Sequence, residues 1–143
     1  MNREDVEQIE TLISERTAAV ASGDVERMSA AIAEDVVIFD VVPPMRAVGR
    51  EAARRRFREW LETYRGAPRW ETLELRVACG GEVAFAHMIS RVTGTLVSGS
   101  PVDMWFRTTL GLEKRDGRWL IVHDHSSDPF NPTTGKAITD ARP

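Results

Sequence analysis

The feature that most constrains the fold is a change in the period of the hydrophobic pattern near residue 68. Before this point, apart from the β-branched and aromatic run at residues 36–39, apolar residues recur about every 3.6 residues, the period of an amphipathic helix. After it, apolar and polar residues alternate in four successive segments separated by Gly, Pro and Asp, as in strands joined by turns. Helices followed by consecutive strands are typical of the α+β class, in which helices cover one face of a strongly curved, mostly antiparallel sheet.

Turn and cap residues set the limits of the predicted elements. Gly23 ends the first helix, Asp24 can cap the second, and Pro43-Pro44 interrupts the backbone after the first strand. The tail after Pro129 is rich in Pro, Thr and Gly, which predicts an extended arm. The predicted helices span residues 5–20, 24–32 and 49–64, and the predicted strands span residues 36–39, 70–79, 83–97, 102–114 and 119–126.

Length and charge limit the class of protein. A chain of 143 residues matches one domain, over residues 1–143, which is large enough to bury a core and an internal pocket. With 19 Lys and Arg against 22 Asp and Glu, the net charge of −3 offers no positive field for nucleic acid. Cys79 is the one cysteine and no apolar run precedes the first helix, so we expect a cytoplasmic protein without disulfides or a membrane segment.

Asp40 is the first candidate for a catalytic residue. It ends a strongly apolar strand, after Phe39 and before Val41 and Val42. A carboxylate in such surroundings is poorly hydrated, a condition that suits a general base for taking a proton from carbon. The same position also suits an Asp that caps a turn before Pro43, and the sequence leaves both interpretations open.

A second group of ionisable side chains is spread over three adjacent predicted strands. Alternate positions of a strand share a face, so one face of the sheet could carry this group around Trp105. Two His at positions i and i+2 can chelate a metal, but no helical His-Glu-x-x-His motif or Cys pair accompanies them. A hydrogen-bonded network or a subunit contact is the favoured interpretation, and we expect neither a metal nor a cofactor. The group consists of His87, Asp103, Arg107, His123 and His125.

The opposite face of the same strands is mostly apolar with a few hydroxyls, which suits either a core or the lining of an apolar pocket. Alternation alone leaves open which of the two faces lines the pocket. The candidate ligand-contacting residues, taken from the third helix and the late strands, are Phe57, Trp60, Tyr64, Trp105, Phe106, Val122, Asp124 and Ser126.

The order of these elements resembles that of the nuclear transport factor 2-like superfamily. The matching features are Gly23-Asp24 before the second helix, residues 35–40 in the first strand, and Gly49-Arg50-Glu51 at the start of the third helix. The closing run from Arg115 to Ser127, followed by Pro129-Phe130, is similar to the end of SnoaL-like proteins and ketosteroid isomerase homologues, and to that of the calcium/calmodulin-dependent kinase II association domain. The resemblance implies a cone-shaped sheet wrapped around the third helix, and a homodimer formed through the sheet.

The resemblance also bears on site residues. In ketosteroid isomerases the general base is an Asp at the end of the first strand, and Asp40 occupies that place. The oxyanion donors do not carry over, because the Tyr of the first helix is replaced by Arg16 and the supporting Tyr by Phe57. The protonated Asp of the late strand falls on Phe106 or Arg107. Arg107 or a histidine is then the group expected to stabilise negative charge.

These observations predict a cofactor-independent enzyme of the isomerase or lyase type. Its cavity would bind an apolar carbonyl compound, and Asp40 would act as the general base. The alternative is a non-catalytic ligand-binding or oligomerisation module with the same fold. Epoxide hydrolysis is a third interpretation, and would need an inward set formed by Asp40, Arg107, and Asp103 or Asp124.

Overall fold

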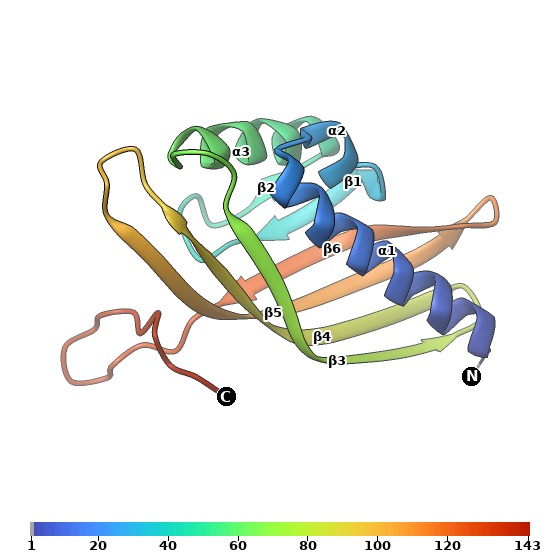
Figure 1. Ribbon diagram of the computed structural model, residues 1–143. Coiled ribbons are helices and arrows are strands. Elements are labelled where there is room, and N and C mark those ends of the chain that lie inside the picture. The colour runs from blue at the N-terminus through green and yellow to red at the C-terminus, as the bar shows by residue number, and fades with distance from the viewer. Residues whose placement is uncertain (1) are drawn as a thin grey trace.

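A computed structural model describes residues 2–143 as three helices on one side of a curved six-stranded sheet (Figure 1). The helices are α1 (Arg3–Ser22), α2 (Val25–Met28) and α3 (Arg50–Glu62). The strands are β1 (Ile32–Phe39), β2 (Ala47–Val48), β3 (Arg69–Gly80), β4 (Val83–Thr95), β5 (Pro101–Arg115) and β6 (Arg118–Ser127). None of the helices in the described chain is long and apolar enough to cross a membrane.

The strands lie in the order β2-β1-β6-β5-β4-β3. β3 to β6 pair as consecutive antiparallel neighbours, whereas β1 joins β6 in parallel. The sheet is therefore mostly antiparallel with the helices gathered on one face, and the predicted α+β class is confirmed. The face that the helices cover is called the inner face below, and the opposite face is called the outer face.

Two details of the predicted elements are wrong. α2 ends at Met28, whereas the spacing of Met28 and Ile32 predicted a helix that continues through Ile32. Ile32 instead begins β1 and pairs with Ile121 of β6, and both side chains are buried. Two apolar residues four positions apart fit either structure, and the partner strand decides between them. The two-residue β2 has no signal of its own and exists through the pairing of Val37 with Val48.

α1 begins and ends where its cap residues place it. The Oδ1 atom of Asn2 accepts a hydrogen bond from the backbone N–H of Glu4, which satisfies a free donor of the first turn. Gly23 ends the helix with a left-handed backbone at φ 67°, which costs little without a Cβ atom. Between these ends, Ile9 and Ile13 of α1 are buried against the inner face of the sheet.

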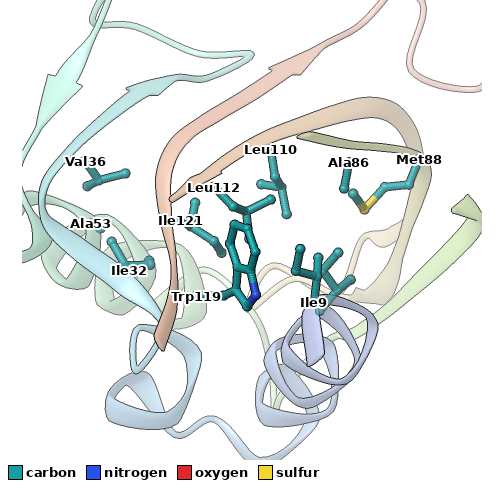
Figure 2. Packing of buried hydrophobic residues seen from close by; sticks show 11 residues of the cluster. Ile9, Ile32, Val36, Ala53, Ala86, Met88, Leu110, Leu112, Trp119 and Ile121 are labelled. Carbon is teal, nitrogen blue, oxygen red and sulfur yellow. The ribbon is translucent and has the colours of Figure 1, made fainter. Parts of the chain in front are cut away.

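The main core lies between α1, α3 and the inner face of the sheet (Figure 2). Ile9 of α1 and Ile121 of β6 are fully buried, and Leu110 and Leu112 of β5 belong to the same cluster. Burying a side chain of this size stabilises a fold by about 1.5–3 kcal/mol relative to leaving it exposed. This packing holds α1 against the sheet and so positions the polar side chains of α1 described below.

A β-bulge in β6 changes which of its residues face the helices. The register between β5 and β6 shifts between Gly111 and Leu112, and this leaves Val122 as an extra residue in β6. Ile121 lies in the core before the bulge, and Asp124 reaches the inner side after it, where it contacts α1. Simple alternation along β6 therefore could not decide which face lines the pocket.

Asp5 is buried and links α1 to the sheet by a hydrogen-bonded ion pair with the partly exposed Lys114. Its Oδ1 atom accepts hydrogen bonds from Lys114 Nζ at 2.9 Å and from Trp119 Nε1 at 3.0 Å. These bonds, the one from Lys114 above all, lower the pKa of the Asp5 carboxyl. A carboxyl with a lowered pKa stabilises the fold above its unfolded pKa of about 3.9, and this contribution disappears as the pH falls through the folded pKa.

We expect Asp5→Asn to lower the thermal midpoint at neutral pH and to flatten the loss of stability on acidification. Both effects arise because the Asn amide is neutral, whereas Lys114 and Trp119 stabilise a negatively charged carboxylate at this position in the folded state. Circular-dichroism melts from neutral pH down to about pH 3 measure them. Glu10→Gln, an exposed change on the same helix, is the matched control. Parallel acid curves for the wild type and Asp5→Asn would contradict the prediction.

Candidate functional site

A cavity lies between α1, α3 and the inner face of β3, β4 and β5. Its volume is about 20 Å³, which is room for one or two water molecules. Most of its wall is apolar, and the few polar groups are gathered at two places, one on α1 and one on the strands. The apolar side chains of the wall include Ile13, Val20, Met28, Phe57, Met88 and Leu110.

Arg16 is the one charged residue of the cavity lining. It lies on α1, and its Nη2 atom donates a hydrogen bond to Oδ2 of Asp124 at 2.5 Å. Both side chains are only 15% exposed. The guanidinium also lies 5.9 Å from the ring centroid of Phe57, which favours the cation. Among residues 2–143, no hydrogen-bond partner faces the Nε and Nη1 atoms of Arg16, so these donors remain free.

The polar groups of the strands are three hydroxyls. The hydroxyl oxygens of Ser90 and Thr108 lie 2.8 Å apart, and both side chains are buried. Thr72 also lines the cavity, and its buried Oγ1 atom has no hydrogen-bond partner in the described chain. Buried polar atoms are nearly always paired, so an unpaired one in a cavity wall indicates a place for a ligand or water.

Asp40 lies at the end of β1 and is not part of the cavity lining. Its Oδ1 atom accepts a hydrogen bond from the backbone N–H of Val41 at 2.7 Å, and its Oδ2 atom accepts one from Arg56 at 2.6 Å. The side chain is 35% exposed. The expected dry, apolar surroundings are wrong, because the chain turns after Phe39 and directs the carboxylate to a cation of α3 and to water. The turn-capping interpretation describes this geometry, and a role as general base stays a prediction.

The other predicted ionisable residues lie on the outer face and do not meet the cavity. Asp103 accepts two hydrogen bonds from Arg91, both of 2.9 Å, and these lower the pKa of its carboxyl. Arg107 donates from Nε to Ser127 Oγ at 3.1 Å. Arg107 and His87 border an open depression of about 480 Å³ on this face. The predicted grouping on one face is therefore present, but on the face away from the helices.

The three histidines also belong to the outer face. His123 and His125 contact Phe39 edge to face, with ring centroids 4.7 and 5.5 Å away. His87 stacks with Phe85 at 6.4 Å. Within residues 2–143, no group of three or more His, Cys, Asp or Glu side chains could hold a metal ion. The chelating pair that the i and i+2 spacing allowed has no third ligand in this part of the chain.

The predicted aromatic wall forms two layers. Phe57 lines the cavity together with Trp70, which the sequence did not single out. Behind them, Trp60 contacts Trp70 and Tyr64 with centroid distances of 5.8 and 5.4 Å. Phe106 contacts Trp70 from the strand side at 5.2 Å. Trp60, Tyr64 and Phe106 therefore support the wall and do not line it, and burial raises the pKa of the Tyr64 hydroxyl.

The remaining candidates lie at different places. Val122 is the bulge residue of β6, and Ser126 lies opposite Thr108 in the sheet. Trp105 is buried on the outer side under the C-terminal arm, where Arg91 and Arg142 contact its ring at 4.9 and 5.7 Å. Its backbone N–H donates to the Thr139 carbonyl oxygen, which fixes the arm to β5. Trp105 is therefore absent from the cavity lining.

Comparison with known proteins supports the assignment of the fold. Residues 9–131 match the sequence model of the SnoaL-like domain. No curated protein sequence matches the chain. A nuclear transport factor 2-like protein of unknown function from Pseudomonas putida KT2440 superposes with a TM-score of 0.90 at 28% identity, covering 100% of this chain and 99% of that chain.

Two further solved structures have the same architecture. A candidate calcium/calmodulin-dependent protein kinase II association domain from Xanthomonas campestris gives a TM-score of 0.74 at 25% identity, over 93% of this chain and 87% of that chain. A ketosteroid isomerase-like protein from Erwinia carotovora atroseptica gives 0.75 at 21% identity, over 88% and 97%. The resemblance read from the element order is confirmed, and the chain belongs to the SnoaL-like domain family of the nuclear transport factor 2-like superfamily.

Proposed function

We propose that the protein binds a short, mostly apolar molecule that carries an anionic or carbonyl oxygen, and that Arg16 holds this oxygen in the cavity. The observation that carries the proposal is the state of the Arg16 guanidinium. It is 15% exposed, yet it uses only Nη2 for Asp124. A cation with free N–H groups in an apolar wall can donate charge-assisted hydrogen bonds to a ligand oxygen. The few polar groups of ligand sites fix the orientation of the ligand in this way.

The size of the cavity limits the ligand. A volume of about 20 Å³ lies far below the roughly 300–1,000 Å³ of sites for drug-sized molecules. A ligand of several carbons must therefore displace wall side chains as it enters. Met28 and Met88 are suited to this, because the unbranched thioether side chain repacks easily. The proposal is accordingly for a short ligand and excludes a multi-ring one.

Binding of valerate, a straight-chain acid, tests the proposal. We expect chemical-shift changes in the amides around the cavity, measured by NMR titration, and a loss of binding in the double variant Arg16→Met/Asp124→Leu. The double change removes the cation without leaving an unpaired carboxylate. A charge-assisted hydrogen bond contributes about 1.5–3 kcal/mol, so affinity should fall about tenfold to a hundredfold.

Arg55→Met is the control for this titration, because Arg55 is an exposed cation of α3. It should bind valerate as the wild type does. Equal affinity in the wild type and the double variant would show that Arg16 does not hold the acid. Shift changes confined to the outer face would show that the acid binds elsewhere.

Cofactor-independent proton transfer is a second candidate function. Asp124 does not line the cavity, but it is bonded to the cavity cation Arg16, and its Oδ1 atom accepts no hydrogen bond from the described residues. This second carboxylate oxygen is the observation that favours proton transfer. In such a reaction Asp124 would take a proton from the carbon beside a carbonyl group, and Arg16 would stabilise the oxyanion. The structural likeness to a ketosteroid isomerase-like protein makes isomerisation the first reaction to test. Asp40 remains the base that the family resemblance implies.

A further inference from the structure

Three hydroxyl side chains form a row across adjacent strands of the inner face. Thr72 of β3 lies opposite Ser90 of β4 in the sheet register. The Ser90 hydroxyl lies 2.8 Å from that of Thr108 on β5. Ser90 and Thr108 are 0% and 5% exposed, and all three residues line the cavity. The row is thus a polar strip in the strand wall of the cavity, which is otherwise mostly apolar.

Two O–H groups of this row have no acceptor among the described residues. Ser90 and Thr108 share one hydrogen bond, so one of their two O–H groups donates and the other is left without an acceptor in the described chain. Thr72 Oγ1 has no partner at all among these residues. An unpaired buried hydroxyl is costly, so a group that accepts from both donors would bind favourably.

The free donors of the cavity lie at two separate places. On the strand wall they are the hydroxyls of the row, and on the helix wall they are the N–H groups of Arg16. The hydroxyl of Thr17, which also lines the cavity, is already bonded to the Ile13 carbonyl oxygen at 3.2 Å. Asp124 occupies only the Nη2 atom of Arg16, through its Oδ2 atom. A ligand that carries an acceptor at each of these two places, with an apolar body between them, would pair with the free donors.

We infer that the cavity selects a short oxo acid, with the carboxylate on Arg16 and the ketone oxygen on the hydroxyl row of Thr72, Ser90 and Thr108. The inference rests on the proposed function, because it extends the ligand held by Arg16. The carboxylate matches the one cation of the lining, and the ketone oxygen has two lone pairs for the two free O–H groups. The apolar side chains of the wall contact the carbons between the two groups.

Titrations with levulinate and valerate test the inference, because levulinate has the same chain as valerate with one ketone added. We expect the wild type to bind levulinate about tenfold more tightly, the effect of one to two net hydrogen bonds. Thr72→Val, which replaces the hydroxyl by a methyl of similar size, should remove most of this preference, so that the ratio of the two affinities falls close to one. Thr72→Ser, which keeps the hydroxyl, should retain the preference.

Thr109→Val is the matched control, because Thr109 is the next residue of β5 and lies exposed on the outer face. It should preserve the affinity for both acids. Equal affinity of the wild type for the two acids, or an unchanged preference in Thr72→Val, overturns the oxo-acid inference and leaves the proposed function standing. Failure of the wild type to bind either acid overturns both.

Discussion

Replacing Arg16 by Met is expected to lower the free energy of unfolding by about 3–5 kcal/mol, the range found when one partner of a buried ion pair is removed. The two partners are 2.5 Å apart, and each side chain is 15% exposed. Their attraction offsets the cost of removing both charges from water. With Arg16 gone, Asp124 keeps its desolvation cost and loses its cation. Urea unfolding at neutral pH, followed by circular dichroism, measures the change.

The double variant Arg16→Met/Asp124→Leu separates the cost of an unpaired charge from the loss of packing. Replacing a buried ion pair by apolar side chains is often neutral or stabilising, so we expect the double variant to regain most of the stability lost in the single one. Arg55→Met should leave the unfolding curve unchanged, because Arg55 is exposed. A double variant as unstable as the single one would show that the guanidinium itself, through its contact with Phe57, supports the fold.

The class and order of the elements could be predicted from the sequence because they depend on local patterns. Gly23 and Asp24 mark the junction of α1 and α2 by backbone geometry and by a side-chain cap, both of which act within a few residues. The alternation after residue 68 likewise reports strands that each bury one face. The predicted end of α2 is wrong because Ile32 pairs in β1 with Ile121 of β6, almost ninety residues away in sequence.

The site was harder to predict because it depends on which face of each strand turns inward. The bulge at Val122 brings Asp124, and not His123, to the cavity side, and the pattern of hydrophobic residues does not report it. One signal was available for Arg16, which lies three residues after Ile13 and four before Val20, on the buried stripe of α1. A charged residue on such a stripe needs a buried partner, and this reasoning would have selected it.

Asp124→Asn is expected to slow any proton transfer in the cavity by about a hundredfold to ten-thousandfold, the usual contribution of a positioned general base. The amide keeps an acceptor oxygen for Arg16 but cannot take a proton from carbon. The reaction to follow is the exchange of protons beside the ketone of levulinate for deuterium in heavy water, which NMR detects without knowledge of the natural substrate. An unchanged melting curve of the variant would exclude unfolding as the cause of the loss.

The same assay decides between the two candidate bases. Asp40 is bound by Arg56 and by its own turn, outside the cavity lining, so we expect Asp40→Asn to exchange protons at the wild-type rate. Asp35→Asn is the control, because Asp35 is an exposed carboxylate of β1 that pairs with Arg115. Loss of exchange in Asp40→Asn with none in Asp124→Asn would return the base to the end of β1, where the family resemblance implies it. The loop after β1 would then have to turn the Asp40 carboxylate away from Arg56 before the reaction, because the ion pair with Arg56 holds it outside the cavity lining.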